Sequence, residues 1–321
     1  MVPHGRRLGA HLPVATGLRK TVDRAVAIGA DALQIFTDNP TAWRRRGEPP
    51  RDLEAFRDRL ADRDIRPVAI HASYLINLPG PDDSIYERSI DLLSTELAGA
   101  PAYGARFVNV HIGSHRGTGV DAGIARLVDG IETVLERAPR STSASDGDPA
   151  ILVLENSAGG GGGLGTSITE LAAIADRLET RGIGRADVAF CLDTAHAWGA
   201  GIDMGDPGAI DAFLAAFDTR VGLDRIVLVH LNDTRSGLGS RTDRHEHVGA
   251  GRIGPIGLGH VLRHPGLAHA AAIIETPGMD VGYDAVNLAR ARALAAGRPL
   301  KRLPRAAFDL VGSARGRAAS S

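Results

Sequence analysis

Residues 188–196 read Val-Ala-Phe-Cys-Leu-Asp-Thr-Ala-His, an apolar run that ends in an acid and, three residues later, a histidine. A short, continuous apolar run is typical of a parallel strand that is buried on both faces. Seven further runs of this kind recur along the chain, and we expect each to form a strand: 8–10, 32–36, 68–70, 107–110, 151–154, 225–229 and 272–274. Eight such units, each followed by a helical or loop segment, predict an α/β fold with a single (β/α)8 TIM barrel.

Segments between these runs carry apolar residues three or four positions apart, which predicts amphipathic helices. The clearest stripes are Leu53, Phe56 and Leu60; Ile90, Leu93 and Leu97; and Leu171, Ile174 and Leu178. Because no linker divides the chain, we expect one barrel domain over residues 1–311. Residues 141–149 are polar and predict a surface loop, and residues 312–321 have the composition of a disordered tail.

Composition narrows the class of protein. Of 321 residues, 43% are hydrophobic, which is enough for a large core, and the formal net charge is -1. This balance gives no overall signal for nucleic acid, but it does not exclude DNA, since bound metal ions would add positive charge. A lone cysteine, Cys191, excludes an internal disulfide, and no apolar run approaches the roughly 18 residues of a membrane span. We therefore expect a soluble cytoplasmic protein with no membrane partner.

Acids and histidines stand at the ends of six successive predicted strands. They are His71, His111, Glu155, Asp193, His230 and Glu275, and nearby segments add His196, Asp243 and His245. Taken singly, each has an ordinary alternative: a hydrogen-bonded histidine, an ion pair, or a helix N-cap in the case of Asp193. However, the strand ends of a barrel meet at one mouth, and burying so many carboxylates together is costly without cations. We therefore expect this set to bind metal.

The ligand types favour particular ions. Imidazole and carboxylate without thiolate suit zinc, manganese or iron. Nine ligands are too many for one ion, and shared among three ions they give about three each. Asp243 and His245 are two positions apart, so an extended loop places both side chains on one side, where they can chelate one ion. We expect three Zn2+ ions, with Mn2+ as an alternative at one or more sites, and such clusters suit phosphodiester hydrolysis.

Seven short stretches together resemble the endonuclease IV family, which are metal-dependent apurinic/apyrimidinic (AP) endonucleases with a TIM barrel and three metals. They occur in the family's order and span roughly residues 8–290: IHASYLINL (70–78), NVHIGSH (109–115), LENSAG (154–159), CLDTAH (191–196), HLND (230–233), DRH (243–245) and ETP (275–277).

The resemblance implies a role for each ligand. His71 and His111 would bind the first metal, and Glu155, the catalytic residue, would bridge it to the second. Asp193, His230 and Glu275 would complete the second site, and His196, Asp243 and His245 would hold the third. The implied reaction is cleavage of double-stranded DNA 5′ to abasic sites in base-excision repair. It leaves a 3′-hydroxyl and a 5′-deoxyribose phosphate, and the family is monomeric.

The resemblance also implies DNA contacts, with one departure. Tyr74 matches a tyrosine that lies at the lesion in the family. Thr41 stands where the family places a basic residue in a loop that probes the minor groove. The gap left by a flipped nucleotide would then be filled in another way. We expect Trp43, Arg44 and Arg45 to contact DNA, with a solvated loop as the alternative for the run that continues into Arg46.

Other features of the sequence have more than one interpretation. The glycine run 159–163 is either a flexible loop or a close approach of backbone to a ligand. His11 is expected to support the site or lie in the core. The alternative function is a xylose-isomerase-like sugar isomerase or epimerase, for which His196, Asp243 and His245 would be surplus. A metal-loaded scaffold that binds DNA without activity is a third hypothesis.

Overall fold

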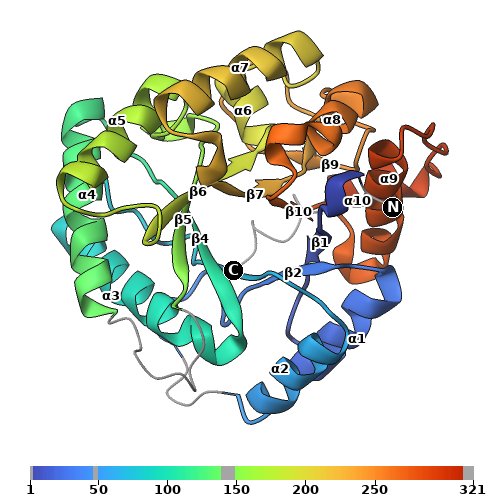
Figure 1. The fold of residues 1–321 in the computed structure, drawn as a ribbon, viewed down its shortest axis with the longest axis horizontal. Helices are drawn as coiled ribbons and strands as arrows, with labels where there is room; N and C mark the ends of the chain where they lie inside the picture. Colours follow the sequence, from blue (N-terminus) through green and yellow to red (C-terminus); the bar gives the residue numbers. More distant parts are fainter. Residues whose placement is uncertain (1–2, 46–49, 139–148, 314–321) are drawn as a thin grey trace.

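Eight parallel strands close into a barrel in the order β1-β10-β7-β6-β5-β4-β3-β2 (Figure 1). The computed structural model describes residues 3–45, 50–138 and 149–313. The barrel strands are β1 (Leu8–His11), β2 (Ala32–Ile35), β3 (Val68–His71), β4 (Ala105–His111), β5 (Ile151–Glu155), β6 (Val188–Asp193), β7 (Ile226–His230) and β10 (Ala271–Ile274). The predicted TIM barrel is confirmed. Strands β3 to β7 each continue one residue beyond their predicted end, into the residue predicted as a ligand.

Helices surround the barrel, because their apolar stripes pack on the outer face of the strands (Figure 1). The predicted stripes fall in α2, α3 and α5, where Phe56, Leu93 and Ile174 are fully buried. The α-helices are α1 (Leu18–Ile28), α2 (Leu53–Asp62), α3 (Asp83–Gly99), α4 (Val120–Arg137), α5 (Ile168–Thr180), α6 (Thr194–Ala200), α7 (Pro207–Arg220), α8 (Gly254–Arg263), α9 (Tyr283–Ala295) and α10 (Ala306–Ser313). Short 3-10 helices are Pro3–Gly5, Ala100–Tyr103, Gly160–Gly162, Leu223–Arg225, Pro265–Leu267 and Met279–Val281.

A second, smaller core fills the inside of the barrel and determines where the site forms. Val153 of β5 and Cys191 of β6 belong to this inner cluster. Side chains of a strand alternate between its faces, so Glu155 and Asp193, two residues further on, point to the same interior. Apolar side chains therefore fill the barrel interior below the carboxyl ends of the strands. At those ends, the same alternation turns polar side chains into the mouth of the barrel.

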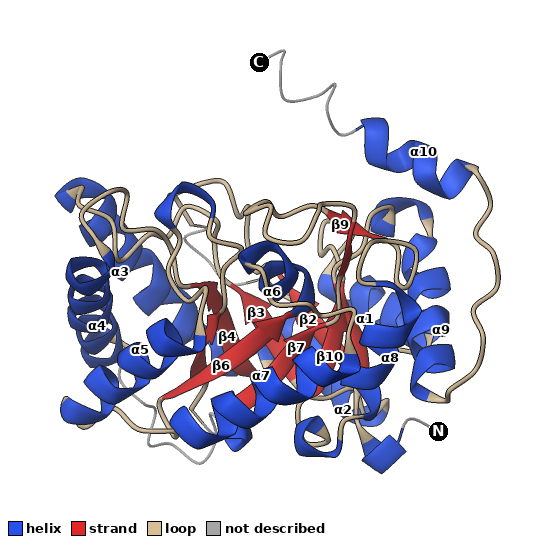
Figure 2. Cartoon of the chain, turned by 90° about the horizontal axis from the view of Figure 1, so that it is seen from above, coloured by secondary structure: helices blue, strands red, loops and turns tan. Residues whose placement is uncertain are grey.

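The remaining elements lie at the edges of the barrel. A two-stranded antiparallel ribbon, β8 (Asp233–Thr234) and β9 (His245–Glu246), forms in the long connection after β7. Figure 2 shows α10 beyond the barrel, on the same side as β9. The predicted surface loop falls largely in residues 139–148, and the tail in 314–321, which are outside the described residues. Within the described ranges, no helix combines the length and apolar character needed to cross a membrane.

Candidate metal centre

The structure brings eight of the nine predicted ligands into three overlapping groups at the barrel mouth, and the ninth, Asp243, joins the third group through ion pairs. Strand register explains the meeting, because His111 lies beside Glu155 and Asp193 lies beside His230 in neighbouring strands. Within each group, the candidate ligand atoms lie within 4.8 Å of one another. Five of these residues end a strand, so the barrel itself fixes their positions.

The first group is His71, His111 and Glu155. The Nε2 atoms of His71 and His111 lie 3.5 and 3.6 Å from Oε2 of Glu155. His71 turns its other ring nitrogen to the carbonyl oxygen of Ala72, at 2.8 Å, so Nδ1 donates there and Nε2 is left to face Glu155. This arrangement orients the ring as metal-binding histidines are usually oriented.

The second group adds Asp193, His230 and Glu275 to Glu155. Nδ1 of His230 lies 3.3 Å from both Glu155 Oε1 and Glu275 Oε2, and 3.9 Å from Asp193 Oδ2. Its Nε2 lies 3.0 Å from Oε1 of Gln34. The Nε2–H group donates a hydrogen bond to this oxygen, so Nδ1 carries the lone pair that can bind a metal. Glu155 therefore belongs to both groups, with one carboxylate oxygen toward each.

The third group surrounds Asp243. Its two oxygens lie 3.2 Å from His196 Nε2 and 3.0 Å from His245 Nε2. Each ring has its Nδ1 near a backbone carbonyl, of Asn156 for His196 and of Glu275 for His245. Asp193 also reaches this group, with Oδ2 3.7 Å from His245, while its Oδ1 accepts the backbone N–H of His196 as the N-cap of α6. Asp193 is thus a helix cap and a member of the cluster at once.

Buried polar side chains hold the carboxylates in place, and most of these side chains were not among the predicted site residues. Asn109 donates to Glu155 Oε2 at 2.6 Å, Asn232 to Asp193 Oδ2 at 2.7 Å, and Gln34 to Glu275 Oε1 at 2.7 Å. His11 lies 3.1 Å from Glu275 Oε1, so it lies beside the cluster as expected. Gln34 and Asn109 are polar residues within apolar strands, and that break in pattern is the signal that could have revealed them.

The electrostatics of the centre fit a site for cations. Burial raises the pKa of Glu155, but His230 and His111 lower it well below its usual value. Burial lowers the pKa of His245, but Asp243 raises it to about 9. Among the described residues, Glu155 Oε1, His230 Nδ1 and His245 Nε2 are buried and have no aligned hydrogen bond, although each faces another candidate ligand atom at 3.0–3.3 Å. Such unsatisfied groups are costly, and divalent ions would satisfy all of them. The imidazole and carboxylate donors therefore fit the predicted zinc or manganese.

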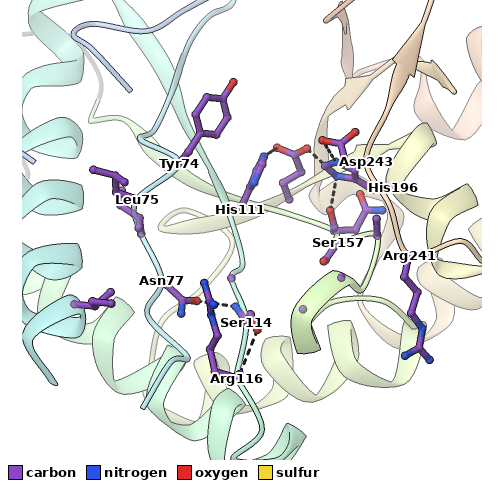
Figure 3. Close-up of a pocket in the computed structure, with 18 of the residues that line it drawn as sticks. Tyr74, Leu75, Asn77, His111, Ser114, Arg116, Ser157, His196, Arg241 and Asp243 are labelled. Atoms are coloured by element: carbon purple, nitrogen blue, oxygen red, sulfur yellow. Dashed lines mark hydrogen bonds and ion pairs between the residues drawn. The ribbon is translucent and has the colours of Figure 1, made fainter. Parts of the chain in front are cut away.

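A pocket of about 660 Å³ opens above the ligands (Figure 3). Tyr74 is 55% exposed, and its ring lies 5.9 Å from that of His111. Trp43 also lines the pocket, and the guanidinium of Arg88 stands 5.8 Å from its ring centre. Both aromatic residues predicted to contact DNA therefore face the space next to the ligands.

The predicted arginine run is divided by the fold. Arg44 is exposed, and Arg46 lies outside the described residues. The side chain of Arg45 is only 13% exposed and pairs with the buried Glu96 of α3. It also donates to the carbonyl of Asn39 at 3.2 Å. Arg45 thus anchors the loop after β2 instead of presenting its charge to solvent, so we do not retain it as a DNA contact.

Two other arginines, which were not among the predicted site residues, line the pocket. Arg116 and Arg241 are exposed and line the pocket, and Figure 3 shows them on opposite sides of it. Both adopt a positive φ, of 50° and 55°, which is uncommon for residues other than glycine. In the described part of the chain, neither forms an ion pair with an acid, so their charge is available to a ligand.

The glycine run after β5 packs closely against neighbouring loops. A methyl group at Gly163 would collide with the Ser157 hydroxyl, and one at Gly160 would lie 2.9 Å from the carbonyl oxygen of Arg241. The segment also bonds to the loop after β4, where the Gly162 carbonyl accepts from His115 at 3.1 Å. The glycine run therefore approaches other parts of the protein closely, and its approach to a ligand stays a prediction.

The fold and these clusters define a TIM-barrel protein whose mouth can hold several divalent metals. The family described as "Xylose isomerase-like TIM barrel" matches residues 22–301. A probable endonuclease 4 of Natranaerobius thermophilus is 39% identical over 88% of this chain and 96% of its own length. The corresponding protein of Oleidesulfovibrio alaskensis is 41% identical over 91% and 96%.

Comparison with solved structures supports the same family. Endonuclease IV from Thermus thermophilus superposes with a TM-score of 0.76 at 38% identity, covering 91% of this chain and 99% of that one. A xylose isomerase domain protein from Planctomyces limnophilus has a TM-score of 0.61 at 17% identity, which shows a shared fold alone. The chain belongs to the endonuclease IV family of xylose isomerase-like TIM barrels.

Proposed function

We propose that this protein is a metal-dependent AP endonuclease that cleaves double-stranded DNA 5′ to abasic sites, leaving a 3′-hydroxyl and a 5′-deoxyribose phosphate. The observation that carries the proposal is the third ligand group, His196, Asp243 and His245, added to two groups that share Glu155. The names of the family members support the same activity. The expected monomeric state and cytoplasmic location stay predictions.

The proposed centre holds three zinc ions, with manganese as an alternative. His71 and His111 would bind the first, Asp193, His230 and Glu275 the second, and His196, Asp243 and His245 the third. Bound divalent ions supply an acidified water and neutralise charge on phosphate oxygens. Glu155 is suited to join the first two sites, because Oε2 faces His71 and His111 while Oε1 faces His230.

The residues of the pocket would position the substrate. Phosphates carry negative charge and are bound most often by arginine. Arg116 and Arg241 flank the pocket and are free of acidic partners in the described part of the chain, so they suit the strand on either side of the lesion. Tyr74 and Trp43 offer aromatic surfaces against which a sugar or base can pack.

Thr41 stands where the family places a basic residue, so this chain has no cation there to fill the gap left by a flipped nucleotide. Its backbone N–H and Oγ1 bond to Asn39 Oδ1 at 3.0 and 2.9 Å, so it forms a local turn. Tyr74 is a large, exposed side chain that lines the pocket next to His111. We therefore propose that Tyr74 takes the larger share in holding the opened duplex.

The competing function is sugar isomerisation or epimerisation. One or two metals suffice for it, so the third group would have no purpose. The 17% identity to a xylose isomerase domain protein concerns the fold alone. Counting metal ions per purified chain separates the two functions, since three ions favour the nuclease and one ion favours the isomerase.

The decisive experiment is incision of a duplex that carries one tetrahydrofuran abasic analogue. Metal-replete protein should cut it 5′ to the lesion, and the 3′-hydroxyl is verified by extension with a polymerase. Glu155→Gln should lower the rate on the order of a hundredfold to a thousandfold. Glu136→Gln, an exposed residue of α4, serves as the matched control and should leave it unchanged. Failure of metal-replete protein to incise would refute the proposal.

A further inference from the structure

A second groove, of about 690 Å³, lies on the outside of the barrel, away from the metal centre. Helix α9 forms one side and residues 298–304 form the other. Figure 2 shows the segment between α9 and α10 rising beside α9 toward α10. The family match ends at residue 301, so part of this wall lies beyond the matched region.

The floor of the groove is apolar. Val286, Ala289 and Ala293 line it, and their spacing of three and four residues places them on one face of α9. Val286 is 39% exposed. Leu300 and Pro299 continue the apolar surface on the opposite wall. An aliphatic side chain of a partner could therefore be buried here.

The groove is held in a fixed shape. Arg290 is buried and donates from Nε to the carbonyl of Val248 and from Nη1 to the carbonyl of Lys301, both at 2.6 Å. The backbone N–H of Arg298 donates to the carbonyl of Ala293 at 2.8 Å, and Leu303 is buried. Because the wall is already fastened to α9, a ligand would not have to order it, and this reduces the cost of binding.

The rim is strongly basic. Arg298, Lys301 and Arg302 are exposed groove residues, and residues 285–308 contain six basic residues and no acid. Within this range Arg292 is paired with Asp31, as Arg137 of α4 is with Asp91. Across the described ranges, the three rim cations form no ion pair with an acid.

We propose that this groove is a docking site for an acidic, extended peptide segment of another protein. Aliphatic side chains of the peptide would pack on the floor, and its carboxylates would pair with the rim. The apolar floor favours a peptide over a nucleic-acid backbone, because phosphate oxygens are bound by cations and hydrogen-bond donors, which the floor does not offer. Residues 314–321 carry two arginines and no acidic side chain, so this segment lacks the charge that the rim requires.

The test uses full-length protein and a fluorescein-labelled peptide of alternating aspartate and leucine, followed by fluorescence anisotropy. We expect saturable binding that weakens with salt. The double variant Lys301→Glu/Arg302→Glu should weaken it by about tenfold or more, as expected for two reversed contacts. The matched control is Arg19→Glu/Lys20→Glu, an adjacent exposed pair on α1 with the same change of charge, and it should bind as the wild type does.

Two further measurements examine the apolar floor and the alternative partner. Ala289→Gln puts a polar side chain on the floor without changing charge, and it should weaken binding by about threefold or more. Incision of abasic duplex should be unaffected by Lys301→Glu/Arg302→Glu, so this inference and the proposed nuclease fail independently. Equal binding by both double variants would overturn the docking site. So would loss of intact-duplex affinity in Lys301→Glu/Arg302→Glu, which would assign the rim to DNA.

Discussion

Asp233 is a single buried carboxylate on which the long loop after β7 depends. Its side chain is fully buried and accepts backbone N–H groups from Thr234 at 2.8 Å, Gly251 at 2.9 Å, Ile253 at 3.0 Å and Gly254 at 3.2 Å. These donors lie at both ends of the loop that carries Asp243 and His245. The carboxylate thus closes the loop that supplies the third ligand group.

The cost of removing this carboxylate follows from the donors it satisfies. Asp233→Ala would leave four N–H groups without their acceptor, and those of Thr234 and Ile253 belong to buried residues. An unsatisfied buried donor costs about 1–3 kcal/mol, so these two alone give about 2–6 kcal/mol. Domains are stable by only about 5–15 kcal/mol, so the loss would be large. Asp233→Asn retains one acceptor oxygen and should lose less.

The assay combines denaturant unfolding with metal analysis. We expect Asp233→Ala to lower the free energy of unfolding by about 2–6 kcal/mol, with Asp233→Asn between it and wild type. Metal content should fall by one ion per chain, because Asp243 and His245 are proposed to hold the third ion. Asp211→Ala removes an exposed aspartate that pairs with His260, and it should lower the free energy of unfolding far less, because solvent screens such a pair. If Asp233→Ala unfolded like Asp211→Ala, the carboxylate would not be what closes the loop.

Three further outcomes are expected. At pH 8, Glu96→Gln should lower the free energy of unfolding by about 3 kcal/mol in a denaturant titration, because it leaves the largely buried Arg45 without its carboxylate. The pKa of His245 is raised from 6.5 to about 9, so its protonated form stabilises the metal-free protein fully below pH 6.5 and this contribution is lost as pH rises through about 9. Melting temperatures of chelator-treated protein should show that loss, and His245→Gln should reduce it without removing it, because the pKa values of His196 and His230 are also raised. Gly163→Ala should destabilise by about 1–3 kcal/mol, because its methyl group collides with a hydroxyl oxygen, whereas Gly184→Ala, which meets open space, should not.

The barrel and the meeting of the candidate ligands at its mouth were predictable from sequence, because both depend on local pattern. An apolar run fixes a buried strand, and period-two alternation carries its last polar residue into the mouth, as with Val153 and Glu155. The environment of Arg45 could not be predicted from local sequence pattern. Its partner Glu96 is 51 residues away on α3, so only the packing of that helix decides whether the arginine faces solvent or the core. Arg116 and Arg241 were missed for the same reason, since loop geometry alone turns them toward the pocket.

The glycine run connects the loops around the centre to one another. Gly160 approaches the carbonyl oxygen of Arg241 so closely that a methyl group would lie 2.9 Å from it. Arg241 in turn donates its N–H to the carbonyl of Gly199 at 3.0 Å, just past His196 on α6. The loop before Asp243 is therefore held between the glycine run and α6. Because Asp243 follows two residues later, a side chain at Gly160 would press on the segment that brings the Asp243 carboxylate to His196 and His245.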